Sequence, residues 1–126
     1  YRRAKHVLTE NRRAHNCAHA LAAGNIPQLS KLMAQSHASM RDDFEITVPE
    51  IDILVNIITT VVGKRGGVRM TGCGFGGCVL ALVDHKLTDA VVTAIENQYT
   101  QQTGLEATVY LCSTCDGAAR IDKYLY

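Results

Sequence analysis

The sequence lacks an excess of charge of either sign. Its 13 lysines and arginines nearly balance its 12 aspartates and glutamates, which gives a formal net charge of +1. Proteins that bind nucleic acids or anionic membranes usually carry a marked basic excess. We therefore expect neither a nucleic-acid partner nor a membrane partner for this chain.

The sequence also lacks any run of 18 apolar residues and any basic-then-apolar secretory leader. A membrane-spanning helix needs about 20 consecutive apolar residues, and a secretory protein needs such a leader. Nearly half of the 126 residues are apolar, and the charged fraction is ordinary, as in a globular chain. These features predict a single domain over residues 1–126, located in the cytoplasm.

Cysteines are few and odd in number, and they form no disulfide or zinc pattern. Cys112 and Cys115 are the one C-x-x-C pair of the five cysteines. A zinc site needs about four ligands, and no second pair is present at a suitable spacing. The cysteines are therefore predicted to be reduced thiols, and no metal site is predicted in this chain.

Familiar catalytic motifs are missing as well. The sequence contains no His-x-His, H-E-x-x-H, G-x-S-x-G or Walker lysine motif. Phosphoryl transfer, for example, requires cations on the phosphate, a magnesium site and a residue that orients the nucleophile. No catalytic residue is predicted in this chain.

What the sequence does have is a glycine-rich stretch, Gly66–Val83. Five glycines lie between Gly67 and Gly77, and apolar or alternating segments of strand length flank them. The pattern predicts strand, glycine loop and strand, over 68–71 and 78–83 for the two strands. A dinucleotide-binding loop is excluded because no helix follows the glycines directly. Such a loop can offer backbone N–H groups to an anion, or it can be a flexible connection without a ligand.

Helical spacing of apolar residues predicts four helices. The first two are expected over residues 2–23 and 27–40. The third is expected to begin at a capping box, Thr47–Glu50, and to end at Gly63. The fourth is expected to begin with Thr88 as its cap and to end at Gly104. Asn25 is predicted to cap the second helix. Further strands are expected over 107–112 and 118–121. This order predicts an α+β fold with a mostly antiparallel sheet covered by helices on one face.

Two polar features in the first half have structural and functional interpretations. The acidic segment 41–46 is predicted to be a loop, which either faces a magnesium nucleotide or a sugar, or simply connects and caps helices. His37 falls on the apolar stripe of the second helix. We expect it to be a hydrogen-bonded packing residue, since no nucleophile is paired with it.

The ten-residue segment Arg69–Cys78 closely resembles the third conserved motif of galactokinases, which belong to the GHMP kinase superfamily. The segment Ser36–Pro49 is similar to the region that precedes this motif in bacterial galactokinases. The similarity to galactokinases extends to three further segments, which are Arg2–Arg12, the strand around Tyr110 and the Asp116–Ala118 end. The resemblance therefore covers essentially the whole chain.

This resemblance implies a C-terminal galactokinase domain with a ferredoxin-like α+β core. Galactokinases transfer the γ-phosphoryl group of ATP to the 1-hydroxyl of galactose, with Mg²⁺. The family's catalytic, sugar-binding and phosphate-loop residues lie upstream, in an N-terminal half absent from this chain, so the fragment alone is expected to be inactive. The motif residues carried over as lining the phosphate and sugar cleft are Thr71, Gly72, Cys73, Gly74, Phe75, Gly76 and Gly77.

One position departs from the family pattern, since Cys73 stands where the family usually has Gly or Ala. A non-glycine residue here predicts a negative φ. Other functions stay open: a GHMP kinase for another sugar such as N-acetylgalactosamine, a non-catalytic galactokinase-like sensor, or a free-standing ferredoxin-like binding module. Apolar surface left by the missing half also makes a dimer of the fragment possible.

Overall fold

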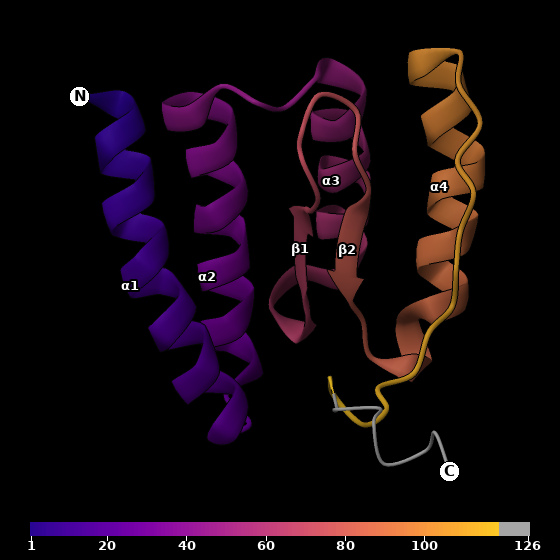
Figure 1. Ribbon diagram of the computed structural model, residues 1–126. Coiled ribbons are helices and arrows are strands. Elements are labelled where there is room, and N and C mark those ends of the chain that lie inside the picture. Colours follow the sequence, from indigo (N-terminus) through magenta and orange to yellow (C-terminus); the bar gives the residue numbers. More distant parts are fainter. Residues whose placement is uncertain (119–126) are drawn as a thin grey trace, which may run out of the picture.

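A computed structural model describes residues 1–118 and shows helices beside a β-hairpin (Figure 1). The helices are α1 (Arg2–Ala22), α2 (Ile26–Ser39), α3 (Pro49–Val62) and α4 (Thr88–Thr103), and the strands are β1 (Gly67–Met70) and β2 (Val79–Leu82). The predicted α+β class with an antiparallel sheet is confirmed. Within the described residues, no helix has the length and apolar character required to cross a membrane.

The two strands pair so that one face of the hairpin is buried. Gly67 lies opposite Leu82, and Met70 lies opposite Val79. Val68 and Met70 face the helices and are buried, whereas Leu80 on the other face is 55% exposed. Alternation along each strand therefore gives the hairpin a buried face and an exposed face.

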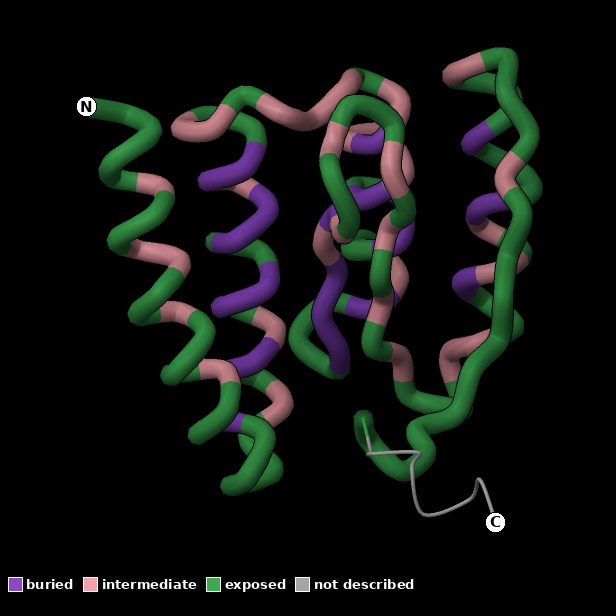
Figure 2. The backbone as a smooth tube through the Cα atoms, in the orientation of Figure 1, coloured by how far each residue is buried: buried purple, intermediate pink, exposed green. Residues whose placement is uncertain are grey.

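The main core lies between the buried face of the hairpin and the helices α3 and α4 (Figure 2). Helix α3 is buried on more than one side, as its wide apolar stripe predicts. The buried core residues are Met40, Ile51, Val55, Ile57, Ile58, Val62, Val68, Met70, Val91, Ile95 and Tyr99.

Helix α2 packs along the edge of β1, and Gly67 permits this close packing, since a Cβ atom there would lie 2.4 Å from Met33 Sδ. Gly66 permits a different close approach, because a Cβ atom there would lie 2.0 Å from the Leu82 carbonyl oxygen of β2. Helix α1 packs on α2 through a smaller cluster that includes Ala20 and Leu32. Most of α1 stays exposed (Figure 2).

One of the three predicted helix caps is present. The Asn25 side chain accepts a hydrogen bond from the Gln28 N–H at 3.1 Å, which confirms that cap. The prediction of a capping box at Thr47–Glu50 is wrong, because the Thr47 hydroxyl donates to the Asp52 carboxylate instead. The prediction that Thr88 caps α4 is also wrong, since α4 follows directly from a 3₁₀ turn that Asp84 caps.

Two further predictions of local structure are wrong. Residues 41–46 do not form a simple loop, because α2 continues into a π-helical turn, Met40–Phe44, which ends at Glu45 with φ +59°. Residues 107–112 are extended but pair with no strand, and Tyr110 is 81% exposed. High β-propensity alone gives no strand without a partner edge. The predicted strand 118–121 lies, except for Ala118, outside the described residues.

We expect Gly66→Ala to lower the free energy of unfolding by about 1 to 3 kcal/mol, because the new methyl group would overlap the Leu82 carbonyl. The φ of Gly66 is −171°, which any residue adopts, so the effect is steric. Urea denaturation measures it. Gly117→Ala is the control: a Cβ there meets no atom within 4 Å, and a change within about 0.5 kcal/mol is expected. Equal losses in the two variants would contradict this packing.

Candidate functional site

The glycine loop, Thr71–Cys78, joins the two strands at the end of the molecule where α1 begins (Figure 1). The Thr71 N–H donates to the Cys78 carbonyl oxygen at 2.8 Å and closes the loop at its base. All seven residues predicted to form the site, Thr71–Gly77, lie in this loop. The loop is therefore a short, closed turn that rises from a buried hairpin.

The backbone of the loop has positive φ at four positions. Gly72, Gly74 and Gly76 have φ values of +88°, +86° and +110°, and Phe75 has +56°. The φ of Cys73 is not positive, which confirms the prediction from its side chain. A non-glycine residue at positive φ is uncommon, and the Phe75 side chain is 72% exposed.

Most of the loop's amides are free to bind a ligand. Within the described part of the chain, no hydrogen-bond acceptor contacts the N–H groups of Gly72, Cys73, Gly74, Gly76 and Gly77. Gly72, Cys73 and Gly76 are also exposed. Successive backbone N–H groups in a turn can form a concave anion site. The loop can therefore donate several hydrogen bonds to a phosphate or a carboxylate.

The tip of the loop is attached to the connection between α2 and α3. The Phe75 N–H donates to the Ile46 carbonyl oxygen at 2.7 Å. A Cβ atom at Gly74 would lie 2.7 Å from the same oxygen, so glycine is required there for its φ and for this close approach. Sequence reasoning missed Ile46, because nothing in the local pattern relates it to the loop.

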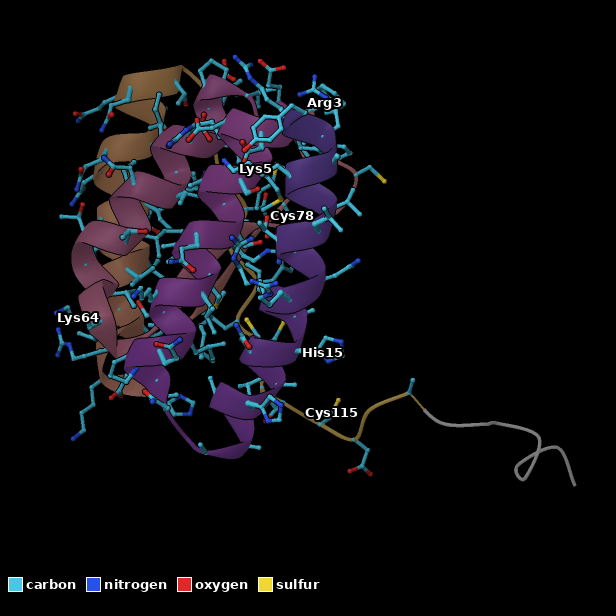
Figure 3. The ribbon with its side chains drawn as sticks, turned by 90° about the vertical axis from the view of Figure 1, so that its left-hand side faces the viewer. Arg3, Lys5, His15, Lys64, Cys78 and Cys115 are labelled. Carbon is cyan, nitrogen blue, oxygen red and sulfur yellow. The ribbon has the colours of Figure 1, made fainter. Side chains whose placement is uncertain are left out.

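Two of the three carboxylates in the acidic segment before Ile46, Asp43 and Glu45, are paired with cations from α1. Arg2 and Arg3 lie 2.9 and 2.8 Å from the Glu45 carboxylate, and Lys5 lies 2.8 Å from Asp43. Figure 3 labels Arg3 and Lys5 at the first turns of α1. Hydrogen bonds from Lys5 and Arg3 lower the pKa of Asp43 and of Glu45, respectively. This pairing supports the structural interpretation of the segment as a connection.

The base of the loop is attached to α2 through His37, which is only 5% exposed. Its Nδ1 accepts a hydrogen bond from the Met70 N–H at 3.2 Å, and its Nε2 lies 3.0 Å from Asp52 Oδ1. Because Nδ1 accepts, the ring proton resides on Nε2 and is donated to Asp52. His37 is thus a hydrogen-bonded packing residue, as predicted.

The cysteines form no disulfide among residues 1–118, and all five thiols are free. Cys73 and Cys78, in the glycine loop, are exposed, and Figure 3 labels Cys78. No group of three or more histidine, cysteine, aspartate or glutamate side chains within the described range is placed to hold a metal ion.

Two comparisons relate this fold to known proteins. The sequence model of a family described as GHMP kinases C terminal matches residues 17–101. A crystal structure of Lactococcus lactis galactokinase complexed with galactose is similar, with 39% sequence identity and a TM-score of 0.80. The match covers 86% of this chain and 28% of that galactokinase. This chain therefore spans less than a third of the length of that relative.

We expect Gly74→Ala to destabilise the protein more than Gly76→Ala. Both positions have positive φ, so an alanine at either site costs about 1 to 3 kcal/mol in backbone strain. Only the methyl group at Gly74 would overlap Ile46, which adds about 1 to 3 kcal/mol. Urea denaturation gives the difference, and hydrogen exchange of the Phe75 amide should accelerate only in Gly74→Ala. Equal losses of stability would refute the contact at the tip.

We also expect stability to fall as the pH drops below about 6.5, the ordinary pKa of histidine. Burial lowers the pKa of His37, although the neighbouring Asp52 opposes the shift. Arg41 and Arg69 lower that pKa further, and burial also lowers the pKa of His6. The unfolded rings therefore bind protons at a higher pH than the folded rings. The stabilisation is complete above pH 6.5 and is lost as the pH falls through the folded pKa values.

Urea denaturation at several pH values between about 7.5 and 5 measures this dependence. In His37→Asn, the slope of stability against pH should be shallower than in the wild type. The pH dependence that remains would come from His6. A slope unchanged by His37→Asn would show that His37 is not held neutral by the fold.

Proposed function

We propose, from the premise that this chain belongs to the GHMP kinase family through its C-terminal domain, that residues 1–126 form the C-terminal domain of a galactokinase. The complete enzyme would transfer the γ-phosphoryl group of ATP to the 1-hydroxyl of galactose, in the cytoplasm. The observation that carries this proposal is the glycine loop, whose five free amides lie in the segment that resembles the third galactokinase motif.

The loop fits phosphate better than it fits a sugar or a metal ion. Its free groups are N–H donors, and its three positive-φ glycines leave the backbone accessible. Phosphate oxygens accept such hydrogen bonds in concave backbone sites. Bound ATP would supply the phosphoryl group, and the five free amides of the loop would hold and orient its phosphate oxygens without exchanging protons.

Magnesium ligands and catalytic side chains would come from the upstream half. Asp43 and Glu45, the two carboxylates nearest in sequence to Ile46, are paired with cations of α1. No cluster of metal-binding side chains occurs among residues 1–118. Phosphoryl transfer needs a metal ion and a group that orients the nucleophile. This chain alone would therefore lack activity.

The exposed face of the hairpin offers a place for that upstream half. Leu80 is 55% exposed and Leu82 is 37% exposed, and Arg69 shares this face. Arg69 also lines a groove of about 360 Å³ between α1 and α2. Exposed leucines beside such a groove are suited to packing against another polypeptide. We propose that the N-terminal part of the galactokinase covers this face, which a second copy of the chain would cover in a dimer of the fragment.

The test is a galactokinase assay with ATP, Mg²⁺ and galactose. It is run on this chain alone, on the separately expressed upstream half, and on a mixture of the two. We expect galactose 1-phosphate only from the mixture, because the catalytic groups and the glycine loop would then share one cleft. Replacing galactose with N-acetylgalactosamine tests the alternative acceptor.

The outcomes separate the candidate functions. Activity of this chain alone would contradict the assignment of catalytic groups to the upstream half. Stable association without activity on either sugar would favour a non-catalytic sensor. In an active mixture, Gly74→Ala should raise KM for ATP more than KM for galactose, while the Gly117→Ala control should leave both unchanged.

A further inference from the structure

We propose that His37 is a positioning residue for the glycine loop. Its neutral imidazole accepts the Met70 amide and so fixes the end of β1 from which the loop starts. This inference rests on the proposed function, because the position of the loop affects a reaction only if phosphate binds there. His37 itself contacts no substrate in this arrangement and acts through Met70.

The need for this contact follows from strand pairing. The Thr71 N–H donates across the hairpin to Cys78, so Met70, one residue earlier, occupies a position whose N–H points away from β2. Met70 is fully buried, with 0% exposure. A buried amide without water needs a protein acceptor, and His37 Nδ1 supplies it at 3.2 Å.

Helix α3 sets the ring in the tautomer that this contact requires. Nδ1 accepts a hydrogen bond only when the proton is on Nε2, and Asp52 Oδ1 lies 3.0 Å from that nitrogen. The other carboxylate oxygen of Asp52 accepts from the Thr47 hydroxyl at 3.2 Å. The carboxylate orients the imidazole on α2, and the imidazole in turn fixes β1.

The loop is consequently held at two points, at its base through Met70 and at its tip through Phe75. The free amides of Gly72, Cys73 and Gly74 lie between these points. Backbone donors act only where they are placed, and a displacement of about 1 Å in a reacting site can lower a rate about 100-fold. Loss of the contact at Met70 should therefore misplace the free amides.

Two amide side chains separate the two hydrogen bonds of His37. In His37→Asn, the oxygen attached to Cγ takes the place of Nδ1 and can still accept the Met70 amide. In His37→Gln, the amide nitrogen takes the place of Nε2 and can still donate to Asp52, but nothing remains at the Nδ1 position. Both substitutions remove the ring, so both lose comparable packing.

The experiment uses the full-length enzyme that contains this chain and compares wild type, His37→Asn and His37→Gln. Hydrogen exchange of the Met70 amide and steady-state kinetics with ATP and galactose are measured. We expect the rate of Met70 amide exchange and kcat/KM for ATP in His37→Asn to stay within about threefold of the wild-type values. His37→Gln should accelerate Met70 exchange and lower kcat/KM for ATP, each by about tenfold or more. Equal behaviour of the two variants in both measurements would overturn the proposal.

Ser36→Ala is the matched control for general destabilisation of α2. Ser36 is 2% exposed and donates to Glu10 Oε2 on α1 at 2.6 Å, so its hydroxyl takes no part in the contact between His37 and Met70. It should lower stability without altering Met70 exchange or the kinetic constants. A wild-type enzyme inactive on galactose would refute the proposed function, whereas the difference in Met70 exchange would still decide whether His37 holds β1.

Discussion

The close contact between α2 and the edge of β1 is the constraint on which the rest of the structure depends. Glycine at position 67 permits it, because a Cβ there would lie 2.4 Å from Met33 Sδ of α2. Met33 and His37 lie four residues apart, on one face of α2. Met33 therefore packs on Gly67 while His37 reaches Met70. A helix that covers a strand edge must provide a hydrogen-bond acceptor for a buried amide on that edge. Here the His37 imidazole accepts from the Met70 amide.

The attachment of α1 has a different physical basis at each end. Ala20, near its C-terminal end, is its one buried residue, and it packs in the smaller cluster. Its first turns are held by ion pairs to Asp43 and Glu45. The pairs to Glu45 are exposed and are screened by salt. The backbone bond between Ile46 and Phe75 does not depend on those charges. The ion pairs orient the π-helical turn, and the backbone bond fixes the loop.

The sequence predicted elements whose signals are local. Apolar spacing indicated all four helices, and the glycines between two apolar runs indicated the hairpin. The π-helical turn was missed because Met40–Phe44 departs from the 3.6-residue period. The Thr47 cap failed because Asp52 accepts its hydroxyl. The contacts of the loop with His37 and Ile46 were not predictable, since they join residues far apart in sequence and involve a backbone group.

The glycine loop offers hydrogen-bond donors but no charge, and this explains why it is held so firmly. A flexible cation is attracted to a phosphate from many directions, whereas an amide acts only in one direction at short range. The cations on the first turn of α1 at this end, Arg2, Arg3 and Lys5, are already paired. In the proposed enzyme, the glycine loop therefore supplies position, and the charge that balances the phosphate would come from groups outside the loop. A site divided in this way requires an accurately held loop, which the contacts at Met70 and Phe75 provide.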